Sequence, residues 1–424
     1  MRYVEILNSI YSRDGKSSYY TLGRVRKAAR GVGDPQELFP AVHITGSNGK
    51  GSVARTVAEI LRRSGLKTGL YTSPHVHRYT ERIRIGGREI PRSEVVRRFD
   101  EVERLRRDGK VPWITFFEIT TLIAFGWFAD EKVDVAVLEV GLGGRLDATN
   151  ICHSVVDVIT TVGLEHTNIL GTSLSQIARE KAGIIKERGP VVLGELPAPA
   201  ARIILKKAGV LRCSVRRYGV DFFAVPNGNG TFDYRGDLLR LRRLRTPLHG
   251  RHQIHNCAVA CAAVEELMRR GFAVKPDIVP KALRSVTWEG RLETISRRPE
   301  ILLDCAHNLP AMRNLIRELD GRKFHLVFGA LHDKPIEKMF ALLRPFARAS
   351  YVSAPKVHRS PTLKELGRRC RTPVYETVSD ALDAAVRDAR RTGLPVLVTG
   401  SVFVVSEARA HFLNLKRVDP PVAM

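Results

Sequence analysis

Residues 41–65, AVHITGSNGKGSVARTVAEILRRSG, constrain the fold more than any other stretch of this sequence. AVHIT is a short β-rich run that ends at a glycine-containing loop. From Ser52 onward, apolar residues recur at helical spacing as far as a terminal glycine, Gly65. The stretch therefore predicts a strand, a tight loop and a helix in succession, which is the repeating unit of a parallel α/β sheet.

The loop resembles a phosphate-binding loop, although its spacing differs from the common G-x-x-x-x-G-K-[ST] pattern. Ile44 stands where the first glycine of that pattern would be, and Gly51 separates Lys50 from Ser52. A positive helix N-terminus and converging backbone N–H groups would still bind phosphate, with Lys50 on the phosphates and the Ser52 hydroxyl on Mg²⁺. The alternative is a glycine-rich turn that only connects the strand to the helix.

The rest of the first part alternates between apolar strands and helices. Strands are predicted at KTGLYTS, VDVAVLEVG and SVVDVITTVG, and helices at TFFEITTLIAFGWFAD and SLSQIAREKAGIIK. β-Branched, almost continuously apolar strands are typical of a parallel sheet covered on both faces. We therefore expect a doubly wound, mostly parallel α/β sheet.

The pattern changes twice further along the chain. From about 187 to 250 we expect a β-rich, hairpin-containing insert with an Asn/Gly turn, followed by a helix at 252–271. Around 287–300 the alternation restarts, with strands predicted at ILLDCA, FHLVFGA, SYVSAP and PVLVTGSVFVV. The sequence thus predicts two domains, 1–290 and a smaller Rossmann-like α/β domain at 291–424.

The composition limits the kinds of partner. The 424 residues carry a formal net charge of +25, and 44% of them are hydrophobic. No run reaches the roughly 18 apolar residues of a membrane span, and the N-terminus has no apolar segment of a secretory signal. The six cysteines are scattered, and Cys257 and Cys261 fall in a helical pattern that indicates core packing rather than zinc binding or a disulfide. We expect a cytoplasmic protein without a membrane partner.

The positive charge favours anionic ligands, either nucleic acid or small molecules such as nucleotides and polycarboxylates. Acids and bases interleave at 92–110 on a helical repeat, whereas 235–253 alternates like a strand that can place several arginines on one face. Because the charge is otherwise dispersed and no nucleic-acid motif is present, we do not expect a nucleic-acid partner.

Glu139 and Lys181 are candidate site residues because of their positions in the sequence alone. Glu139 ends a buried apolar strand, where a carboxylate would point into the crevice that binds ligands in open α/β sheets; the alternative is a buried acid satisfied by backbone N–H groups. Lys181 lies among apolar residues of a predicted helix, where it could also extend its ammonium group to solvent.

Several motifs occur in the same order as in one family. These are TGSNGKGSVA, TSPHVHRYTERI, FFEITTLIAF, LEVGLGGRLDATN, TTVGLEHTNILGTSLSQIAREKAGIIK, GRHQIHNCAVA, WEGRLE, DCAHN and GALHDKP, between about residues 20 and 405. The chain resembles the folylpolyglutamate synthases and dihydrofolate synthases of the Mur ligase superfamily. The glycine loop then corresponds to the P-loop of that family.

The resemblance implies a set of site residues and two cofactors. ATP would bind the loop and four later residues: Gly46, Asn48, Gly49, Lys50, Gly51, Ser52, Asn256, Arg291, Asp304 and His307. Mg²⁺ would be held by Ser52, Ser73, Glu139, His166 and Lys181. Lys181 would carry a carbamate derived from CO₂, with Lys186 as the fallback position. The pterin or folate would contact Thr72, Pro74, His75, Arg82, Phe117, Glu118 and Asp147.

The resemblance also implies the reaction and the residues that carry it. ATP would activate a pteroate or folate carboxylate as an acyl phosphate, and L-glutamate would attack to form an amide. Lys50, Lys181, His166 and Arg291 would be the catalytic residues, and we expect a monomer. The sequence departs from the family at Glu165, where aspartate is usual, and the longer side chain could shift His166. Another Mur-type ligase and a nucleic-acid-binding ATPase are the alternative interpretations.

Overall fold

The computed structural model describes residues 2–13, 21–228, 230–248, 250–416 and 418–420. Its contacts divide the chain into two compact units. Unit 1 comprises Met1–His75, Tyr79–Pro247 and His252–Val286, and unit 2 comprises Val76–Arg78, Leu248–Arg251 and Thr287–Met424. Each unit is built on its own sheet and has its own hydrophobic core, so each is described separately.

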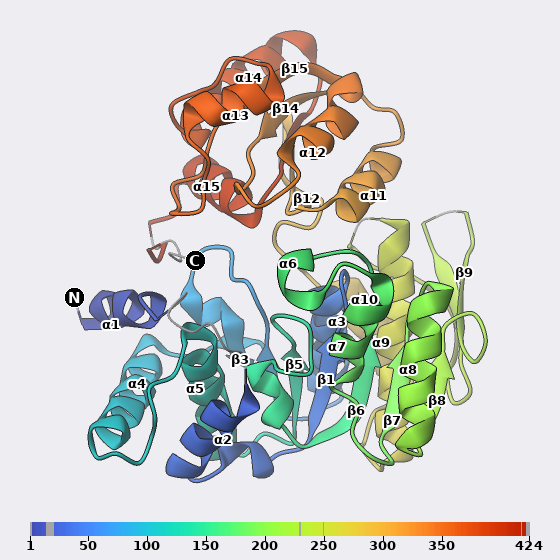
Figure 1. Cartoon of the computed structure of the whole chain (residues 1–424). Helices are drawn as coiled ribbons and strands as arrows, with labels where there is room; N and C mark the ends of the chain where they lie inside the picture. Colours follow the sequence, from blue (N-terminus) through green and yellow to red (C-terminus); the bar gives the residue numbers. More distant parts are fainter. Residues whose placement is uncertain (1, 14–20, 229, 249, 417, 421–424) are drawn as a thin grey trace. The chain divides into compact units, whose positions relative to one another are not determined.

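Unit 1 contains an eight-stranded sheet in the order β4-β3-β2-β5-β1-β6-β7-β8 (Figure 1). The strands from β2 to β8 in that order pair in parallel, and β3 and β4 pair antiparallel at one edge. The strands are β1 Ala41–Thr45, β2 Thr68–Tyr71, β3 Ile83–Ile85, β4 Arg88–Glu89, β5 Val135–Glu139, β6 Ser154–Ile159, β7 Pro190–Leu193 and β8 Ser214–Arg217. The predicted doubly wound, mostly parallel sheet is confirmed.

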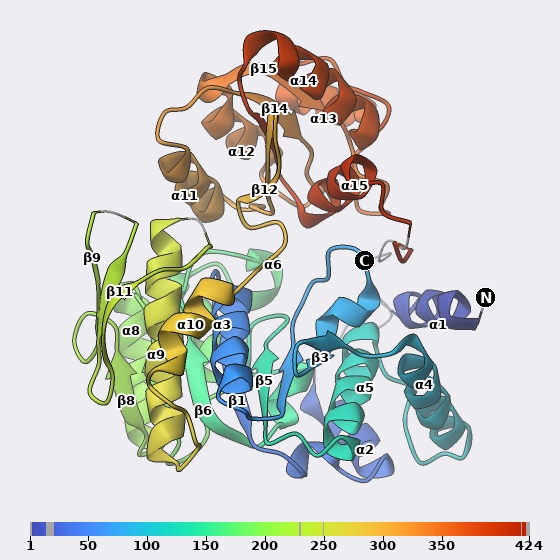
Figure 2. The same ribbon diagram turned by 180° about the vertical axis from the view of Figure 1, so that it is seen from behind.

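Helices cover both faces of this sheet. On one face α3 packs with α9 and α10 over β1, β5 and β6, and on the other α7 and α8 pack over β6 and β7 (Figures 1 and 2). The helices are α1 Arg2–Tyr11, α2 Leu22–Gly31, α3 Lys50–Arg63, α4 Arg92–Arg107, α5 Phe116–Asp130, α6 Thr167–Leu170, α7 Leu174–Ala182, α8 Ala198–Val210, α9 Arg251–Arg269 and α10 Ile278–Ser285. Short 3₁₀ turns lie at η1 Pro35–Glu37, η2 Tyr79–Arg82 and η3 Ala148–Ile151.

The predicted insert at 187–250 is too long. β7, α8 and β8 continue the parallel sheet as far as Arg217, so only the following segment forms a separate sheet. That three-stranded antiparallel sheet consists of β9 Phe223–Pro226, β10 Phe232–Arg235 and β11 Arg240–Leu244. Its inner face packs against α9, where Tyr234 donates to Glu265.

Unit 2 is a five-stranded sheet in the order β12-β13-β16-β14-β15, parallel except for β12. Helices α11, α12 and α13 pack on one face and α14 and α15 on the other. The strands are β12 Glu293–Arg297, β13 Glu300–Asp304, β14 Phe324–Phe328, β15 Ala347–Val352 and β16 Val396–Thr399. The helices are α11 Leu309–Leu319, α12 Ile336–Leu343, α13 Leu363–Cys370, α14 Val378–Thr392 and α15 Val402–Phe412, with a 3₁₀ turn η4 at Arg344–Phe346. The Rossmann-like architecture expected for this part of the chain is confirmed.

One predicted strand in unit 2 is wrong. PVLVTGSVFVV was expected to be a strand throughout, but β16 ends at Thr399 and α15 begins at Val402. Ser401 caps this helix by accepting a hydrogen bond from the backbone N–H of Val404, which stabilises a helix start inside a β-branched run. The change places Val404 and Val405 in the helix–sheet core.

Two other expectations concern the burial of Cys257 and Cys261 and the membrane-spanning potential of the helices. Cys257 and Cys261 are fully buried in α9, as the helical pattern predicted, and the six cysteines are all unpaired in the described chain. Within the described residues, no helix combines the length and apolar character needed to cross a bilayer.

Candidate active site

The loop between β1 and α3 requires glycine at two positions because other groups approach it closely. A Cβ at Gly46 would lie 1.9 Å from Thr160 Oγ1, and one at Gly49 would lie 2.4 Å from Asn256 Oδ1. Gly49 also has φ +85°, a left-handed conformation that favours glycine. The structure thus brings Asn256 of α9 against the loop.

The segment after β6 holds this loop in place. Ser47 Oγ accepts from the Gly163 N–H at 2.8 Å and donates to the Gly163 carbonyl at 3.1 Å. Thr160 Oγ1 donates to the Asn48 carbonyl at 2.6 Å, and the Asn48 N–H donates to Thr161 Oγ1 at 2.9 Å. The two threonines were not among the predicted site residues, although they lie in the TTVGLEH motif.

The N-terminus of α3 has the chemistry of an anion site. Lys50 begins the helix and its Nζ donates to the Gly46 carbonyl at 2.8 Å, so the ammonium group lies over the loop. Ser52 is buried in the first turn. Unpaired N–H groups and a cation at a helix start attract phosphate oxygens.

Lys181 is almost completely buried and has a carboxylate partner. Its side chain is 1% exposed, and Nζ donates to Glu165 Oε1 at 2.8 Å. Burial lowers the pKa of Lys181 to about 8; nearby Lys50 acts in the same direction, and Glu165 opposes it. The alternative that Lys181 extends to solvent is therefore wrong.

Glu165 belongs to the same cluster. Burial would raise the pKa of Glu165, but the positive charges of Lys50 and Lys181 outweigh it and leave that pKa below its ordinary value. Glu165 thus pairs directly with the α7 lysine and also responds to the charge of the P-loop lysine. In the sequence, Glu165 was noted only as a departure from the family pattern.

The residues expected to hold Mg²⁺ fit that ion unequally. Glu139 ends β5, is 4% exposed, and accepts from the Ser73 N–H through Oε2 at 3.0 Å. Carboxylate and hydroxyl oxygens suit Mg²⁺, whereas His166, which precedes α6 at φ +44°, offers a less usual ligand. Lys181 fits only if its positive charge is replaced by a negative one.

Two of the residues expected to bind the pterin contact each other. Arg82 Nε donates to His75 Nδ1 at 2.7 Å, and its guanidinium lies 5.1 Å from the centre of the Phe116 ring. The Thr72 N–H donates to the Arg82 carbonyl. Pro74 is exposed next to them, between Ser73 and His75.

The half-buried Phe117 ring packs against the backbone beyond β5. A Cβ at Gly141 would lie 2.3 Å from the Phe117 ring, so Gly141 is the residue that lets the ring lie there. Tyr71 contacts the same ring edge-on at 6.0 Å between centroids. Phe117 is therefore fixed in position with part of its ring exposed.

Glu118 has an ion-pair partner that sequence analysis missed. Arg24 Nε lies 2.9 Å from Glu118 Oε2 and 3.0 Å from Oε1, and the Arg24 guanidinium stacks 5.9 Å from the Trp113 ring centre. The Thr115 N–H and hydroxyl also donate to Glu118, closing a capping box at the start of α5. Glu118 thus links α2 to α5.

Asp147 is held by the loop that follows β5. Its Oδ2 accepts from the Gly141 and Leu142 N–H groups at 3.0 Å each, and its Oδ1 accepts from the Thr149 N–H at 3.0 Å and hydroxyl at 2.5 Å. These donors use about all of the lone pairs of a carboxylate. Asp147 therefore fixes the shape of the GLGGRLDATN loop.

In unit 2, the predicted residues gather at the end of β13. Asp304 accepts from the Leu292 and Ala306 N–H groups at 2.9 Å each; burial raises its pKa, and the nearby Arg291 charge opposes that change. His307 Nδ1 lies 2.9 Å from the Cys305 carbonyl in the same turn. The structure brings Arg291, Asp304 and His307 together.

Comparison with known proteins places the chain. The Mur ligase middle-domain family matches residues 44–264, and the Mur ligase glutamate ligase domain matches residues 290–402. The folylpolyglutamate synthase of Lacticaseibacillus casei is 33% identical over 98% of this chain and 100% of that protein. The dihydrofolate synthase/folylpolyglutamate synthase of Escherichia coli is 36% identical over 86% of this chain and 84% of that protein. The chain belongs to the folylpolyglutamate synthase/dihydrofolate synthase family of Mur ligases.

A solved structure of the family has the same fold. Escherichia coli FolC in complex with DHPP and ADP superposes with a TM-score of 0.89 at 32% identity, covering 97% of this chain and 98% of that one. This Mur ligase is therefore an ATP-dependent ligase by family, and the comparison rules out the nucleic-acid-binding ATPase as its class.

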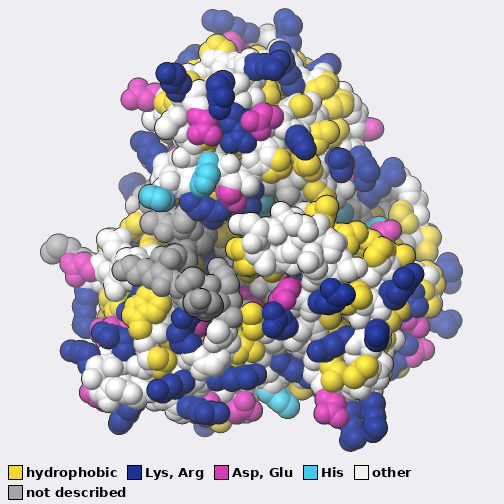
Figure 3. Space-filling view, viewed as in Figure 1, with side chains coloured by type: hydrophobic (Ala, Val, Ile, Leu, Met, Phe, Trp, Pro, Cys, Tyr) yellow, Lys and Arg dark blue, Asp and Glu magenta, His cyan; other side chains and the backbone are white. Residues whose placement is uncertain are grey.

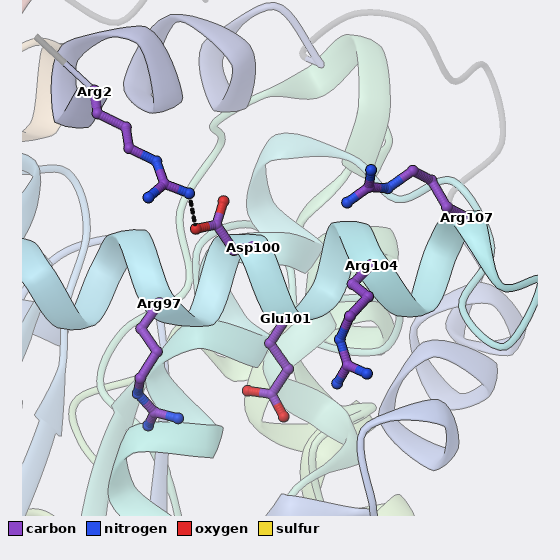
Figure 4. A pocket seen from close by; sticks show the side chains of 6 residues that line it. All are labelled: Arg2, Arg97, Asp100, Glu101, Arg104 and Arg107. Carbon is purple, nitrogen blue, oxygen red and sulfur yellow. Dashed lines mark hydrogen bonds and ion pairs between the residues drawn. The ribbon is translucent and has the colours of Figure 1, made fainter.

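A surface depression of this ligase lies apart from these residues. It has a volume of about 510 Å³, and its lining residues come from the first turn of α1 and from α4 (Figure 4): Arg2, Arg97, Asp100, Glu101, Arg104 and Arg107. Arg2 pairs with Asp100 across it, and Arg97 pairs with Glu94 and Asp130. Arg2 and Arg97 are thus compensated, and the depression contains none of the predicted site residues.

Proposed function

We propose that this Mur ligase forms an amide between L-glutamate and the carboxylate of dihydropteroate or a folate. ATP would transfer its terminal phosphoryl group to that carboxylate, giving an acyl phosphate and ADP. The glutamate amine would then attack the acyl carbon and release phosphate. The observation that carries this proposal is the glycine loop with Lys50, together with the buried Lys181 that pairs with Glu165, in a chain of this family.

The P-loop residues would bind the ATP phosphates. Backbone N–H groups of Gly46, Gly49 and Gly51 and the Lys50 ammonium would compensate charge that grows in the transition state. Because the Asn48 N–H already donates to Thr161, Asn48 would contact ATP through its side chain. Asn256, Arg291, Asp304 and His307 are assigned to the nucleotide by resemblance, with Arg291 stabilising the transferred phosphoryl group.

Ser52, Ser73, Glu139 and His166 would hold Mg²⁺, together with a modified Lys181. When bound, Mg²⁺ neutralises phosphate charge and orients the nucleotide. The Ser73 N–H already fixes one Glu139 oxygen, which orients the carboxylate before an ion arrives.

Lys181 is suited to form a carbamate with CO₂. The ammonium first releases one proton to solvent. The neutral amine then attacks CO₂, so that an N–C bond forms as one C=O π bond opens, and the nitrogen releases a second proton to solvent; a cation has become an anion. A pKa of about 8 leaves an appreciable neutral fraction at physiological pH, and burial protects the product from water. Glu165 would then keep Lys50 as its counter-charge, which is consistent with its interaction with both lysines.

Thr72, Pro74, His75, Arg82, Phe117, Glu118 and Asp147 would form the pterin site. Phe117 offers a fixed ring for stacking, and the His75–Arg82 pair offers polar groups. Because the Asp147 carboxylate oxygens are engaged internally, its contribution would be to shape the loop. By resemblance, we place this activity in the cytoplasm and in a monomer.

ADP release tests this function and separates its substrates. Purified protein is incubated with ATP and Mg²⁺ plus dihydropteroate or tetrahydrofolate, each with and without L-glutamate. Release that requires both the pterin and glutamate supports the proposal and identifies the accepted substrate. Release that depends on neither contradicts it.

A further inference from the structure

The arginine-rich segment that the ligase site does not use forms the outer face of the β9–β11 sheet. Phe232, Tyr234 and Leu244 face inward and are buried against α9. Because side chains alternate along a strand, the residues between them face outward. The cross-strand register places Phe223, Arg235 and Arg240 in one row of that outer face.

This row combines cations with exposed apolar groups. The three side chains are exposed, and Val225 lies beside Phe223 on the same face, where Phe223 is 41% and Val225 39% exposed. Arg242 is exposed on the next strand position, and Arg243 and Arg245 follow it. Asp233 is the acid between them, opposite Val225. The face therefore carries a net positive charge next to an aromatic ring.

The charge of this face is less compensated than that of the other arginine-rich segment. On α4, Arg97, Arg98 and Arg106 pair with Glu94, Glu103 and other acids at hydrogen-bond distance. Arg104 and Arg107 of that helix have no carboxylate within ion-pair distance among the described residues, but four acids lie on the same helix. Among the described residues, no carboxylate lies within ion-pair distance of Arg235, Arg240 or Arg242. The pKa of Asp233 is lowered mainly by hydrogen bonds from the Arg243 N–H and the Asn227 side chain, and the charges of Arg242 and Arg235 lower it further from a longer distance. Lys and Arg side chains are spread over the visible surface with fewer Asp and Glu side chains among them (Figure 3).

Contrary to the expectation from the dispersed charge, we propose that the outer face of the β9–β11 sheet binds single-stranded nucleic acid, independently of the ligase reaction. Guanidinium groups would contact phosphates, and Phe223 would stack on a base, since a sheet face with aromatic and arginine side chains suits unpaired bases. The strands lie at the outer side of unit 1 beside α9 (Figure 2), and the outward side chains of all three strands are exposed at Phe223, Arg235 and Arg240. An acidic peptide would use the arginines without the ring, and an anionic lipid surface is the competing occupant that the vesicle competition below distinguishes.

The test uses the full-length protein and fluorescent oligo-uridine and oligo-thymidine strands, with binding followed by anisotropy at about 50 and 200 mM NaCl. The variant R235Q/R240Q/R242Q should weaken binding at least tenfold at the lower salt concentration. For three phosphate contacts, the slope of log affinity against log salt should be about −2 in the wild type and near zero in the variant. Phe223→Ala should weaken binding about fivefold without changing that slope.

The control variant R97Q/R104Q/R107Q on α4 removes the same charge and should bind as the wild type does. Both triple variants should keep ligase activity, which shows that they are folded. Equal loss of binding in the two triple variants would assign it to bulk charge and overturn the proposal. An unchanged affinity in Phe223→Ala, or equal competition by poly-L-glutamate or anionic vesicles, would identify a general polyanion surface and also overturn it.

Discussion

Replacing Glu165 by glutamine removes the counter-charge of Lys181 while keeping the shape of the side chain. Burial already lowers the pKa of Lys181 from 10.5 to about 8. Since one pKa unit corresponds to about 1.4 kcal/mol, burying this lysine costs about 3 kcal/mol at neutral pH. Removing one partner of a buried pair typically costs about 3–5 kcal/mol if the other charge remains.

Lys181 can avoid most of that cost by losing its proton. At pH 7, burying Lys181 in its neutral form costs about 5 kcal/mol relative to the protonated lysine of the unfolded chain, compared with about 3 kcal/mol in the wild type. The free energy of unfolding of Glu165→Gln should therefore fall by no more than about 1–2 kcal/mol. The folded-state pKa is lowered, so the unfolded chain binds the proton more tightly. In the wild type, the free energy of unfolding therefore rises as the pH increases from about 8 to 10.5. In the variant, this rise begins at a lower pH. At about pH 9 Lys181 is mostly neutral in both, and the coupling should almost vanish.

A double-mutant cycle with Lys181→Met isolates this coupling. Urea unfolding is followed by tryptophan fluorescence in a Trp288→Phe background, because Trp113 and Trp127 then report on unit 1 alone. We expect a coupling free energy of about 1–2 kcal/mol at pH 7 and near zero at about pH 9. A coupling below about 0.5 kcal/mol at pH 7, or one that is the same at both pH values, would refute the buried charge pair.

The other predictions concern the loop, the carbamate and the chain's division. Lys50→Ala should reduce kcat/KM at least about a hundredfold, whereas Lys67→Ala, an exposed lysine, should leave it unchanged. Lys181→Ala should stay folded by circular dichroism but lose most ligase activity, with partial recovery in acetate or formate; full activity without them would exclude the carbamate. Gly49→Ala should abolish ATP binding in calorimetry because its Cβ meets Asn256, while Gly33→Ala, at the same φ of +85° in open space, should bind normally. A fragment ending at 286 should show no glutamate-dependent release of ADP. Glutamate-dependent release by this fragment would show that unit 2 is dispensable.

Local patterns predicted much of unit 1. Three elements could be predicted because each is a continuous run with one periodicity: the β1–loop–α3 unit, the helix at Phe116–Asp130 and the strand ending at Glu139. β8 was missed because an edge strand reading SVRR, largely exposed, has no apolar signal. The α15 helix was mistaken for a strand because a short β-branched run does not separate the two structures.

The P-loop was predictable from sequence, but the interactions around it were not. Lys181 and Glu165 are 16 positions apart on different elements, and Arg24 and Glu118 are 94 apart. No periodicity connects such pairs, because only the packing of the sheet and its helices brings them together. For the same reason, the outward arginine row became visible only through the cross-strand register; a bulge between β10 and β11 interrupts the simple alternation expected for 235–253.

The product itself tests the central claim most directly. The protein is incubated with ATP, Mg²⁺, isotopically labelled L-glutamate and the pterin substrate identified by ADP release, and the pterin fraction is analysed by mass spectrometry beside a Lys50→Ala control. We predict a pterin product that has gained one labelled glutamyl residue, formed only with ATP and almost absent from the control. A labelled product of equal yield in the control, or ADP release without any glutamylated pterin, would contradict the assignment of this chain as a folate glutamate ligase.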